Sequence, residues 1–285
     1  MEIMPLLKKA QDYLSTKGIE NPRLTAEILL AHCLGLKRID LYLNYDRPLN
    51  DRELSTYRSL LSRRAQHYPL QYLTGEVEFY SSRFLVAEGV FIPRPETEVL
   101  VERVKEAIER EAMVADIGTG CGVIAISLAK IFPLARFYAS DIFEDAIRVA
   151  KDNAVKNRVE ERITFLLGDL LAPFKGLEGK LDAVVSNPPY IPGNKLDNLP
   201  DEVRLYEPKA AVDGGKGGTE IQKRIISEAW PYLREGGILA LEVGDLQSKR
   251  VMSLMEGRYS RIEVFPDLNG IKRVVMGRKA QGEKA

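Results

Sequence analysis

The chain has 285 residues, 45% of them hydrophobic and 29% charged, so it is long enough for about two globular domains. Its 41 basic and 41 acidic residues cancel, which argues against a protein held to nucleic acid or to an anionic membrane by its overall charge. Two cysteines are too few for a disulfide framework, and two histidines are too few for a histidine-rich metal site, so we expect no metal. The sequence has no Ser-His-acid spacing, which argues against a hydrolase.

Residues 1–70 have helical periodicity and no strand pattern, which predicts a small N-terminal helical bundle. Asn21, followed by proline, is predicted to cap a helix that ends at Gly35, and Asn50 is predicted to cap another. His32 lies in an apolar helical pattern, where packing is the expected role. The N-terminal segment lacks the apolar core of a signal peptide, and no run of 18 apolar residues occurs, so we expect a cytoplasmic protein without membrane association.

The period changes to two in residues 71–93, which predicts a β-hairpin that links the helical domain to a second domain, 94–285. Turn residues at Ser81-Ser82 and at Gly89 bound its strands. The segment "PRPETEVLVERVKEAIERE" follows and is predicted to be a helix, because it begins with proline and acidic residues.

Strands and helices then alternate, which indicates an α/β fold: a mostly parallel, seven-stranded, Rossmann-like sheet covered by helices on both faces. The predicted strands are "MVADIG", "RFYASD", "RITFLLGD", "LDAVVS", "GGILALEV" and two strands around residues 267–270. That closing hairpin makes the last strand antiparallel. The tail "RKAQGEKA", residues 278–285, has a composition typical of disorder.

The first predicted strand ends in a glycine-rich loop, "DIGTGCG", where ligands bind in sheets of this kind. Its G-x-G-x-G spacing differs from the G-x-G-x-x-G fingerprint for pyrophosphate, and a Walker lysine is absent, which argues against a nicotinamide oxidoreductase. The loop supplies five candidate cofactor contacts: Gly118, Thr119, Gly120, Cys121 and Gly122.

Acidic residues end the next two strands. Asp141, 23 residues after Gly118, is predicted to accept hydrogen bonds from both hydroxyls of a ribose. Asp169 either accepts from the amino group of adenine or is a turn residue. Three strand ends therefore predict a site for a nucleoside with a non-phosphate tail, and S-adenosyl-L-methionine is the candidate.

The fourth strand ends in "NPPY", residues 187–190. A residue before proline favours extended backbone, so the carbonyl groups of Asn187 and Pro188 are predicted to point out of the sheet. The Asn187 Oδ1 and the Pro188 carbonyl oxygen are then predicted to accept the two hydrogens of a planar –NH2 group, with Tyr190 as a stacking surface. Such a nitrogen is a poor nucleophile, so holding it in line with a sulfonium methyl is the expected catalysis. Asn187, Pro188 and Tyr190 are the candidate catalytic residues, and the logic leaves adenine, cytosine and a carboxamide open.

Over nearly its whole length the chain resembles the HemK/PrmC family of protein-(glutamine-N5) methyltransferases. The matching segments are "PLQYLTGEVEFY", "FIPRPETE", "DIGTGCG", "SNPPYIP" and "EPKAAVDGGKGG". The resemblance implies a class I S-adenosylmethionine-dependent methyltransferase domain that methylates the side-chain amide of the glutamine in the Gly-Gly-Gln loop of class I peptide chain release factors. It implies release factors as partners and a helical domain that docks the substrate. We expect no direct nucleic acid and a monomer.

The resemblance also implies roles for single residues. The glycine loop, Asp141 and Asn187 contact the cofactor, and the glutamine is held by Asn187, Pro188, Pro189 and Tyr190. Relatives often have an aromatic residue where Leu170 stands, which leaves open how adenine packs there.

Several alternatives stay open at this stage. In "FIPRPETE", Arg94 and Glu96 belong either to a simple helix start or to a wall of the cofactor pocket, and residues 207–218 form either a flexible connection or a glycine-rich lid. "NPPY" alone is also compatible with a nucleic-acid amino methyltransferase of the adenine-N6 type. A non-enzymatic binding module on a dead methyltransferase fold is disfavoured by the intact glycines, Asp141 and "NPPY".

Overall fold

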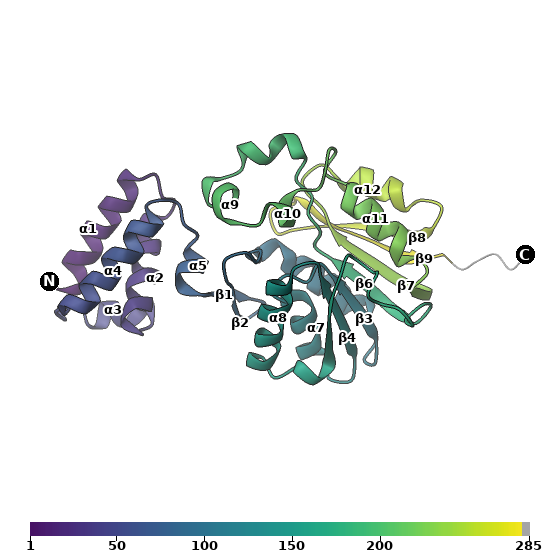
Figure 1. Cartoon of the computed structure of the whole chain (residues 1–285), viewed down its shortest axis with the longest axis horizontal. Coiled ribbons are helices and arrows are strands. Elements are labelled where there is room, and N and C mark those ends of the chain that lie inside the picture. Colours follow the sequence, from purple (N-terminus) through teal and green to yellow (C-terminus); the bar gives the residue numbers. More distant parts are fainter. Residues whose placement is uncertain (281–285) are drawn as a thin grey trace, which may run out of the picture. The chain divides into compact units, whose positions relative to one another are not determined.

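The N-terminal part of the chain is all helical in the computed structural model, which describes residues 1–280 (Figure 1). Its helices are α1 (Ile3–Thr16), α2 (Pro22–Leu34), α3 (Arg38–Leu43), α4 (Asp51–Arg64) and α5 (Leu70–Thr74). Leu14, Leu29, Leu41 and Tyr57 are fully buried between them. The predicted helical region is confirmed, except that residues 70–74 are a helix where the hairpin linker was expected to begin.

The two predicted helix caps differ in outcome. Asn50 caps α4 as expected, because its side chain accepts a hydrogen bond from the Glu53 N–H at 2.9 Å. Asn21 stands at the N-cap of α2, and the helix ends at Gly35 as expected, but the Asn21 backbone is left-handed, with φ 48°, and its side chain makes no capping bond. The packing role of His32 is wrong: it is exposed, because the buried residues of α2 end at Ala31.

A short helix from much later in the chain completes this helical unit, which comprises Met1–Glu76 together with Pro200–Tyr206. The helix is α9 (Asp201–Tyr206). The Arg64 guanidinium pairs with Glu202 at 2.9 Å, and the Tyr206 hydroxyl donates to the Gln66 carbonyl at 2.9 Å. The chain therefore leaves the second unit after Leu199 and returns to it at Glu207.

The second unit is built on a seven-stranded sheet with strand order β5-β4-β3-β6-β7-β9-β8. The strands are β3 (Met113–Ile117), β4 (Arg136–Asp141), β5 (Ile163–Leu167), β6 (Leu181–Ser186), β7 (Leu233–Glu242), β8 (Tyr259–Pro266) and β9 (Lys272–Lys279). The first five run parallel, and β9 is antiparallel to both β7 and β8. This confirms the predicted α/β fold and its antiparallel last strand.

Helices cover the sheet in two groups (Figure 1). On one face pack α6 (Glu98–Ala107), α7 (Val123–Ile131) and α8 (Glu144–Lys156), and on the other α11 (Glu220–Ala229) and α12 (Ser248–Met255). The second group buries Ile225, Ile226, Val251 and Met255 against the apolar side chains of β3, β6 and β7. This packing fixes the carboxyl ends of the parallel strands along one edge.

Shorter elements connect these parts. They are the hairpin β1 (Glu76–Phe79) and β2 (Ser82–Leu85), the 3₁₀ turns η1 (Pro95–Thr97), η2 (Glu160–Arg162) and η3 (Gly193–Asn198), and α10 (Lys209–Val212). Arg278 and Lys279 belong to β9, so the prediction of disorder is wrong for them, because they pair in the sheet. Its last part, 281–285, lies outside the described residues. No helix in residues 1–280 has the length and apolar character needed to cross a membrane.

Candidate active site

A cavity of about 480 Å³ lies at the carboxyl ends of four neighbouring parallel strands, and its size is typical of a small-molecule site. Residues that follow β3, β4, β5 and β6 line it, together with segments 89–97 and 208–224. The predicted site residues among its walls are Gly118, Thr119, Gly120, Cys121, Asp141, Asp169, Leu170, Asn187 and Pro189. Gly122, Pro188 and Tyr190 were predicted as well but are not among the residues that line it.

The glycine loop forms the floor of the cavity after β3. Gly118 and Gly120 have φ of 68° and 56°, and a Cβ built on either one meets no atom within 4 Å, so their missing side chains leave open space for a ligand. Asp116, which the sequence reading did not single out, fixes the loop from below. Its Oδ2 accepts from the Thr119 hydroxyl at 2.7 Å and from the Ala125 N–H at 3.2 Å, and burial raises its pKa to about 7.

Asn153 on α8 is a second residue that holds the loop and that sequence patterns did not indicate. Its side chain is fully buried. The Nδ2 group donates to the carbonyls of Cys121 and Leu85, both at 2.9 Å, and Oδ1 accepts from the Leu85 N–H at 2.6 Å. One amide thus ties the glycine loop to the β1–β2 hairpin. Burial raises the pKa of the Cys121 thiol to about 12, so this cysteine stays protonated and is not a nucleophile.

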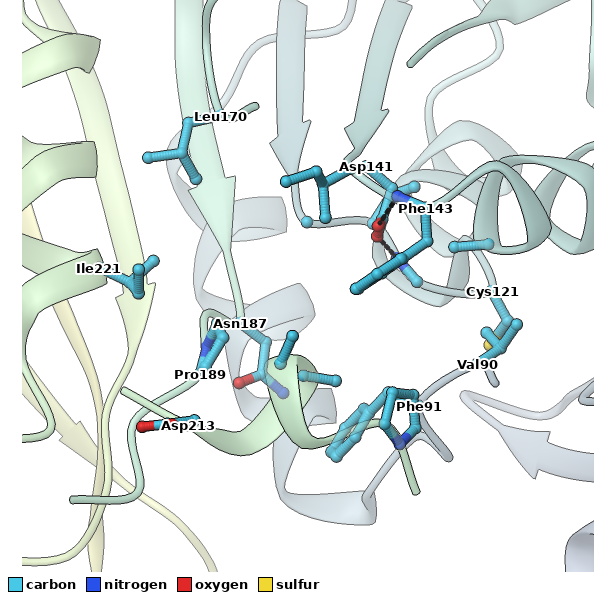
Figure 2. A pocket seen from close by; sticks show the side chains of 18 of the residues that line it. Val90, Phe91, Cys121, Asp141, Phe143, Leu170, Asn187, Pro189, Asp213 and Ile221 are labelled. Carbon is cyan, nitrogen blue, oxygen red and sulfur yellow. Dashed lines mark hydrogen bonds between the residues drawn. The ribbon is translucent and has the colours of Figure 1, made fainter. Parts of the chain in front are cut away.

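Asp141 ends β4 with its carboxylate at the cavity wall (Figure 2). Its Oδ2 accepts from the Gly120 N–H at 2.9 Å and its Oδ1 from the Phe143 N–H at 3.0 Å. Burial raises its pKa, and the two backbone donors lower it. Each oxygen keeps a further lone pair, so the carboxylate is able to accept from two hydroxyl groups of a ligand.

At the cavity wall after β5, the Asp169 carboxylate already has a partner within the protein, which the sequence did not predict. The Asp169 carboxylate pairs with Arg224 of α11, with an Nη2–Oδ2 distance of 2.7 Å. Leu170 has a left-handed backbone, with φ 46°, and packs against the apolar core below. Among the described residues that line the cavity, Arg224 is the single basic one, and it is paired. Phe91 and Phe143 add aromatic walls to the cavity (Figure 2).

The "NPPY" segment lies directly after β6, at the rim. The Asn187 Nδ2 donates to the Thr97 Oγ1 at 3.0 Å. Within residues 1–280, no donor pairs with the Asn187 Oδ1 or with the Pro188 carbonyl oxygen. Both oxygens thus keep lone pairs that no donor in the described residues uses. Tyr190 is not among the residues that line the cavity, and burial raises the pKa of its hydroxyl to about 12.

"FIPRPETE" combines both of its alternative interpretations. Pro95–Thr97 is a 3₁₀ turn that leads into α6, and Phe91, Pro93 and Thr97 line the cavity. The Arg94 guanidinium itself does not line it: it forms an ion pair with Glu207, donates to the Ile92 carbonyl at 2.7 Å and stacks 4.9 Å from the centroid of the Phe91 ring. Arg94 therefore orders the segment that carries the aromatic wall.

Glycines after α10 pack directly on the "NPPY" segment. The Ile191 N–H donates to the Val212 carbonyl, and the Gly214 N–H donates to the Ile191 carbonyl, both at 2.9 Å. A Cβ at Gly218, which has φ 75°, would lie 2.6 Å from the Tyr190 carbonyl oxygen. Gln247, just before α12, links the two segments, because its Nε2 donates to the carbonyls of Tyr190 at 2.8 Å and Gly218 at 3.2 Å.

We expect Gly218→Ala to displace the Tyr190 carbonyl and to lower the single-turnover rate of the reaction at least about tenfold, since overpacking of this kind costs about 1–3 kcal/mol. Gly236→Ala is the matched control, because Gly236 also has a positive φ, 71°, but a Cβ there meets nothing within 4 Å. Rates and melting temperatures of both variants test this. Equal rate losses in the two would show that backbone strain alone, and not the contact with Tyr190, is responsible.

Comparisons with known proteins agree with this architecture. Residues 5–75 match the family "PrmC N-terminal domain", and residues 83–201 match the family "Methyltransferase small domain". The chain is 42% identical over 278 residues to a release factor glutamine methyltransferase of Geobacter sulfurreducens, covering 97% of this chain and 96% of the relative. It is 44% identical over 277 residues to the protein of that name from Moorella thermoacetica, covering 96% and 97%.

Two solved structures share the fold of the second unit at low sequence identity. One is a methyltransferase from Pyrococcus furiosus, with a TM-score of 0.52, 20% identity, and coverage of 70% of this chain and 89% of that one. The other is a ribosomal protein L11 methylase from Lactobacillus delbrueckii, with a TM-score of 0.50, 20% identity, and coverage of 71% and 89%. At this identity the likeness concerns the fold alone.

Proposed function

The chain belongs to the release factor glutamine methyltransferase family, and we propose that it methylates the side-chain amide nitrogen of the glutamine in the Gly-Gly-Gln loop of class I peptide chain release factors. S-adenosyl-L-methionine is the proposed methyl donor, and it would supply a methyl group activated by a sulfonium. The observation that carries the proposal is the Asn187 side chain in the wall of a nucleoside-type cavity, where neither its Oδ1 nor the adjacent Pro188 carbonyl oxygen has a donor within residues 1–280.

The proposed work of the protein is binding and orientation. A carboxamide nitrogen has its lone pair delocalised, and burying its –NH2 group without acceptors costs about 2–7 kcal/mol. Two oxygens at the end of β6 accept both hydrogens and so aim the nitrogen at the cavity. Such positioning can lower the activation free energy by about 7–11 kcal/mol. The same acceptors stabilise the positive charge that develops on the nitrogen. This mechanism needs no histidine.

The donor site is proposed to consist of the cavity walls described above. Asp141 would hold the ribose, while Gly118 and Gly120 let the ligand approach the backbone closely. Asp169 is paired with Arg224, so a hydrogen bond from the adenine amino group to Asp169 would require this ion pair to rearrange. Incubation with labelled S-adenosylmethionine and either release factor, ribosomal RNA or DNA tests the substrate class. We expect label in the release factor only, and label in either nucleic acid would contradict the proposal.

The helical unit is proposed to dock the release factor away from its Gly-Gly-Gln loop. Ile39, Leu43 and Tyr45 expose 61%, 72% and 59% of their surface, and Ile39 and Leu43 lie one turn apart on α3. Exposed apolar side chains grouped in this way are typical of protein–protein contacts.

We expect Leu43→Ser to raise the KM for the intact release factor about tenfold, as for a residue that contributes more than about 1 kcal/mol to an interface. The KM for a short Gly-Gly-Gln peptide should stay unchanged, because the peptide does not reach the docking surface. Val155→Ser on α8, where valine is 60% exposed, is the matched control. A parallel rise in KM for protein and peptide would instead indicate a structural role for Leu43.

A further inference from the structure

Thr97 has an unusual hydrogen bond for its position. It stands at the N-cap of α6, where a threonine hydroxyl ordinarily accepts from a backbone N–H of the first turn. It makes no such bond here, and its Oγ1 instead accepts from the Asn187 Nδ2 at 3.0 Å. Thr97 is only 2% exposed, so water does not compete for the hydroxyl.

A buried carboxyl group, that of Glu242, lies near Thr97 and has no other role in the proposed reaction. Glu242 ends β7, and the register of Ser186 with Leu241 places it beside Asn187 on the neighbouring parallel strand. It is 1% exposed, and its Oε2 has no hydrogen-bond partner in residues 1–280. Burial raises its pKa to about 7, while the hydroxyl of Thr97 and, more weakly, that of Tyr190 lower it as hydrogen-bond donors. Arg273 and Glu96 are the charged groups that act on it.

A count of protons gives these contacts a direction. A threonine hydroxyl has one proton to donate and lone pairs with which to accept. The Thr97 oxygen accepts from the Asn187 Nδ2 at 3.0 Å, so it meets that amide with a lone pair, and its one proton stays available for Glu242, whose pKa the hydroxyl lowers. The Asn187 amide therefore has its –NH2 toward Thr97 and its Oδ1 the other way. Figure 2 shows the Asn187 oxygen directed to the side where Pro189 and Asp213 lie.

We infer that Thr97 and Glu242 are positioning residues that lock the Asn187 side-chain amide with its oxygen facing the substrate, a role that rests on the proposed function of Asn187 as an acceptor. The lock matters because the two ends of an amide have nearly the same shape. A flipped Asn187 would present –NH2 to the –NH2 of the substrate, and two donors cannot pair. Binding energy and in-line geometry would be lost together.

The first test needs no substrate. In protein labelled with 15N-asparagine, the side-chain signals that vanish in Asn187→Ala identify the Asn187 amide. Losing the Thr97 acceptor, a bond worth about 0.5–1.5 kcal/mol, should speed its hydrogen exchange up to about tenfold in Thr97→Val and leave it near wild type in Thr97→Ser. Unchanged exchange in Thr97→Val would overturn the inference, whatever the substrate of the protein is.

The second test measures the reaction. Thr97→Val should lower the single-turnover rate at saturating S-adenosylmethionine about tenfold, because one hydrogen bond of about 1.4 kcal/mol is lost. Thr97→Ser should restore the rate. In the Asn187→Ala background Thr97→Val should have no further effect, since both changes act through one amide. A wild-type rate in folded Thr97→Val, or the same loss in both backgrounds, would overturn the role of Thr97.

Glu242→Leu tests the buried end of the lock. It should lower the rate as Thr97→Val does without lowering the melting temperature, because a buried carboxyl with an unpaired oxygen costs free energy in the folded state. A wild-type rate in Glu242→Leu would remove Glu242 from the lock. If the wild-type protein transfers no methyl to a release factor at all, the proposed function fails, and the exchange measurement still decides the inference.

Discussion

Replacing Asn187 with alanine is expected to lower the single-turnover rate of methyl transfer about a hundred- to thousandfold, the usual cost of losing one oriented hydrogen bond in a transition state. The Asn187 Oδ1 is one of two acceptors at the rim, and the Pro188 carbonyl alone cannot hold both hydrogens of a planar –NH2 group. Asn198→Ala is the control, because Asn198 is exposed and lies on the same stretch of chain. Both variants must keep the wild-type melting temperature, and a near-wild-type rate in Asn187→Ala would end the proposed mechanism.

Asn187→Asp tests whether Asn187 acts as an oriented amide or only as a hydrogen-bond acceptor. Aspartate keeps the shape and the acceptor atoms but has no –NH2 group for the Thr97 oxygen. The single Thr97 proton would then be shared between two carboxylates, that of the variant and that of Glu242, in a buried setting. We therefore expect the aspartate variant to be nearly as slow as alanine. If Asn187 were merely a turn former, aspartate would serve almost as well.

Asp141→Ala is expected to weaken binding of S-adenosylhomocysteine about a hundredfold or more, since two charge-assisted hydrogen bonds of about 1.5–3 kcal/mol each are removed. The change also leaves the N–H groups of Gly120 and Phe143 without their acceptor, which loosens the cavity wall. Asp145→Ala is the matched control, because Asp145 is an exposed carboxylate paired with Arg148 on α8. Calorimetric titration gives both dissociation constants, and an unchanged value for Asp141→Ala would take Asp141 out of the ribose site.

The parts of the site that sequence reading located share a simple geometry. Gly118, Asp141, Asp169 and Asn187 all follow apolar strand patterns, and parallel strands put their carboxyl ends on one edge. The prediction that these residues lie close together did not require the order of the strands in the sheet. The resemblance to a known family added the substrate class, which spacing alone left open.

The parts that sequence reading missed depend on tertiary contacts without a local signal. Thr97 looks like an ordinary helix cap, and Glu242 ends an apolar strand in the same way as many surface residues; their link to Asn187 exists only because β6 and β7 lie side by side. No predicted element covers residues 200–206, yet Glu202 pairs with Arg64 of α4 and Tyr206 with Gln66 just after that helix. The insertion of β9 between β7 and β8 is likewise a choice of pairing that no pattern within one strand specifies.

The proposed glutamine methylation is tested most directly by incubating an unmodified class I release factor with this protein and S-adenosylmethionine. The release factor is then mapped by tandem mass spectrometry of its peptides. We predict a single added methyl group on the glutamine of the Gly-Gly-Gln peptide, with fragments that lose methylamine in place of ammonia from the side chain. A release factor whose Gly-Gly-Gln glutamine is replaced by alanine should remain unmodified. A methyl group on any other residue, or none on this glutamine when the wild-type protein binds the donor, would contradict the proposed glutamine methylation.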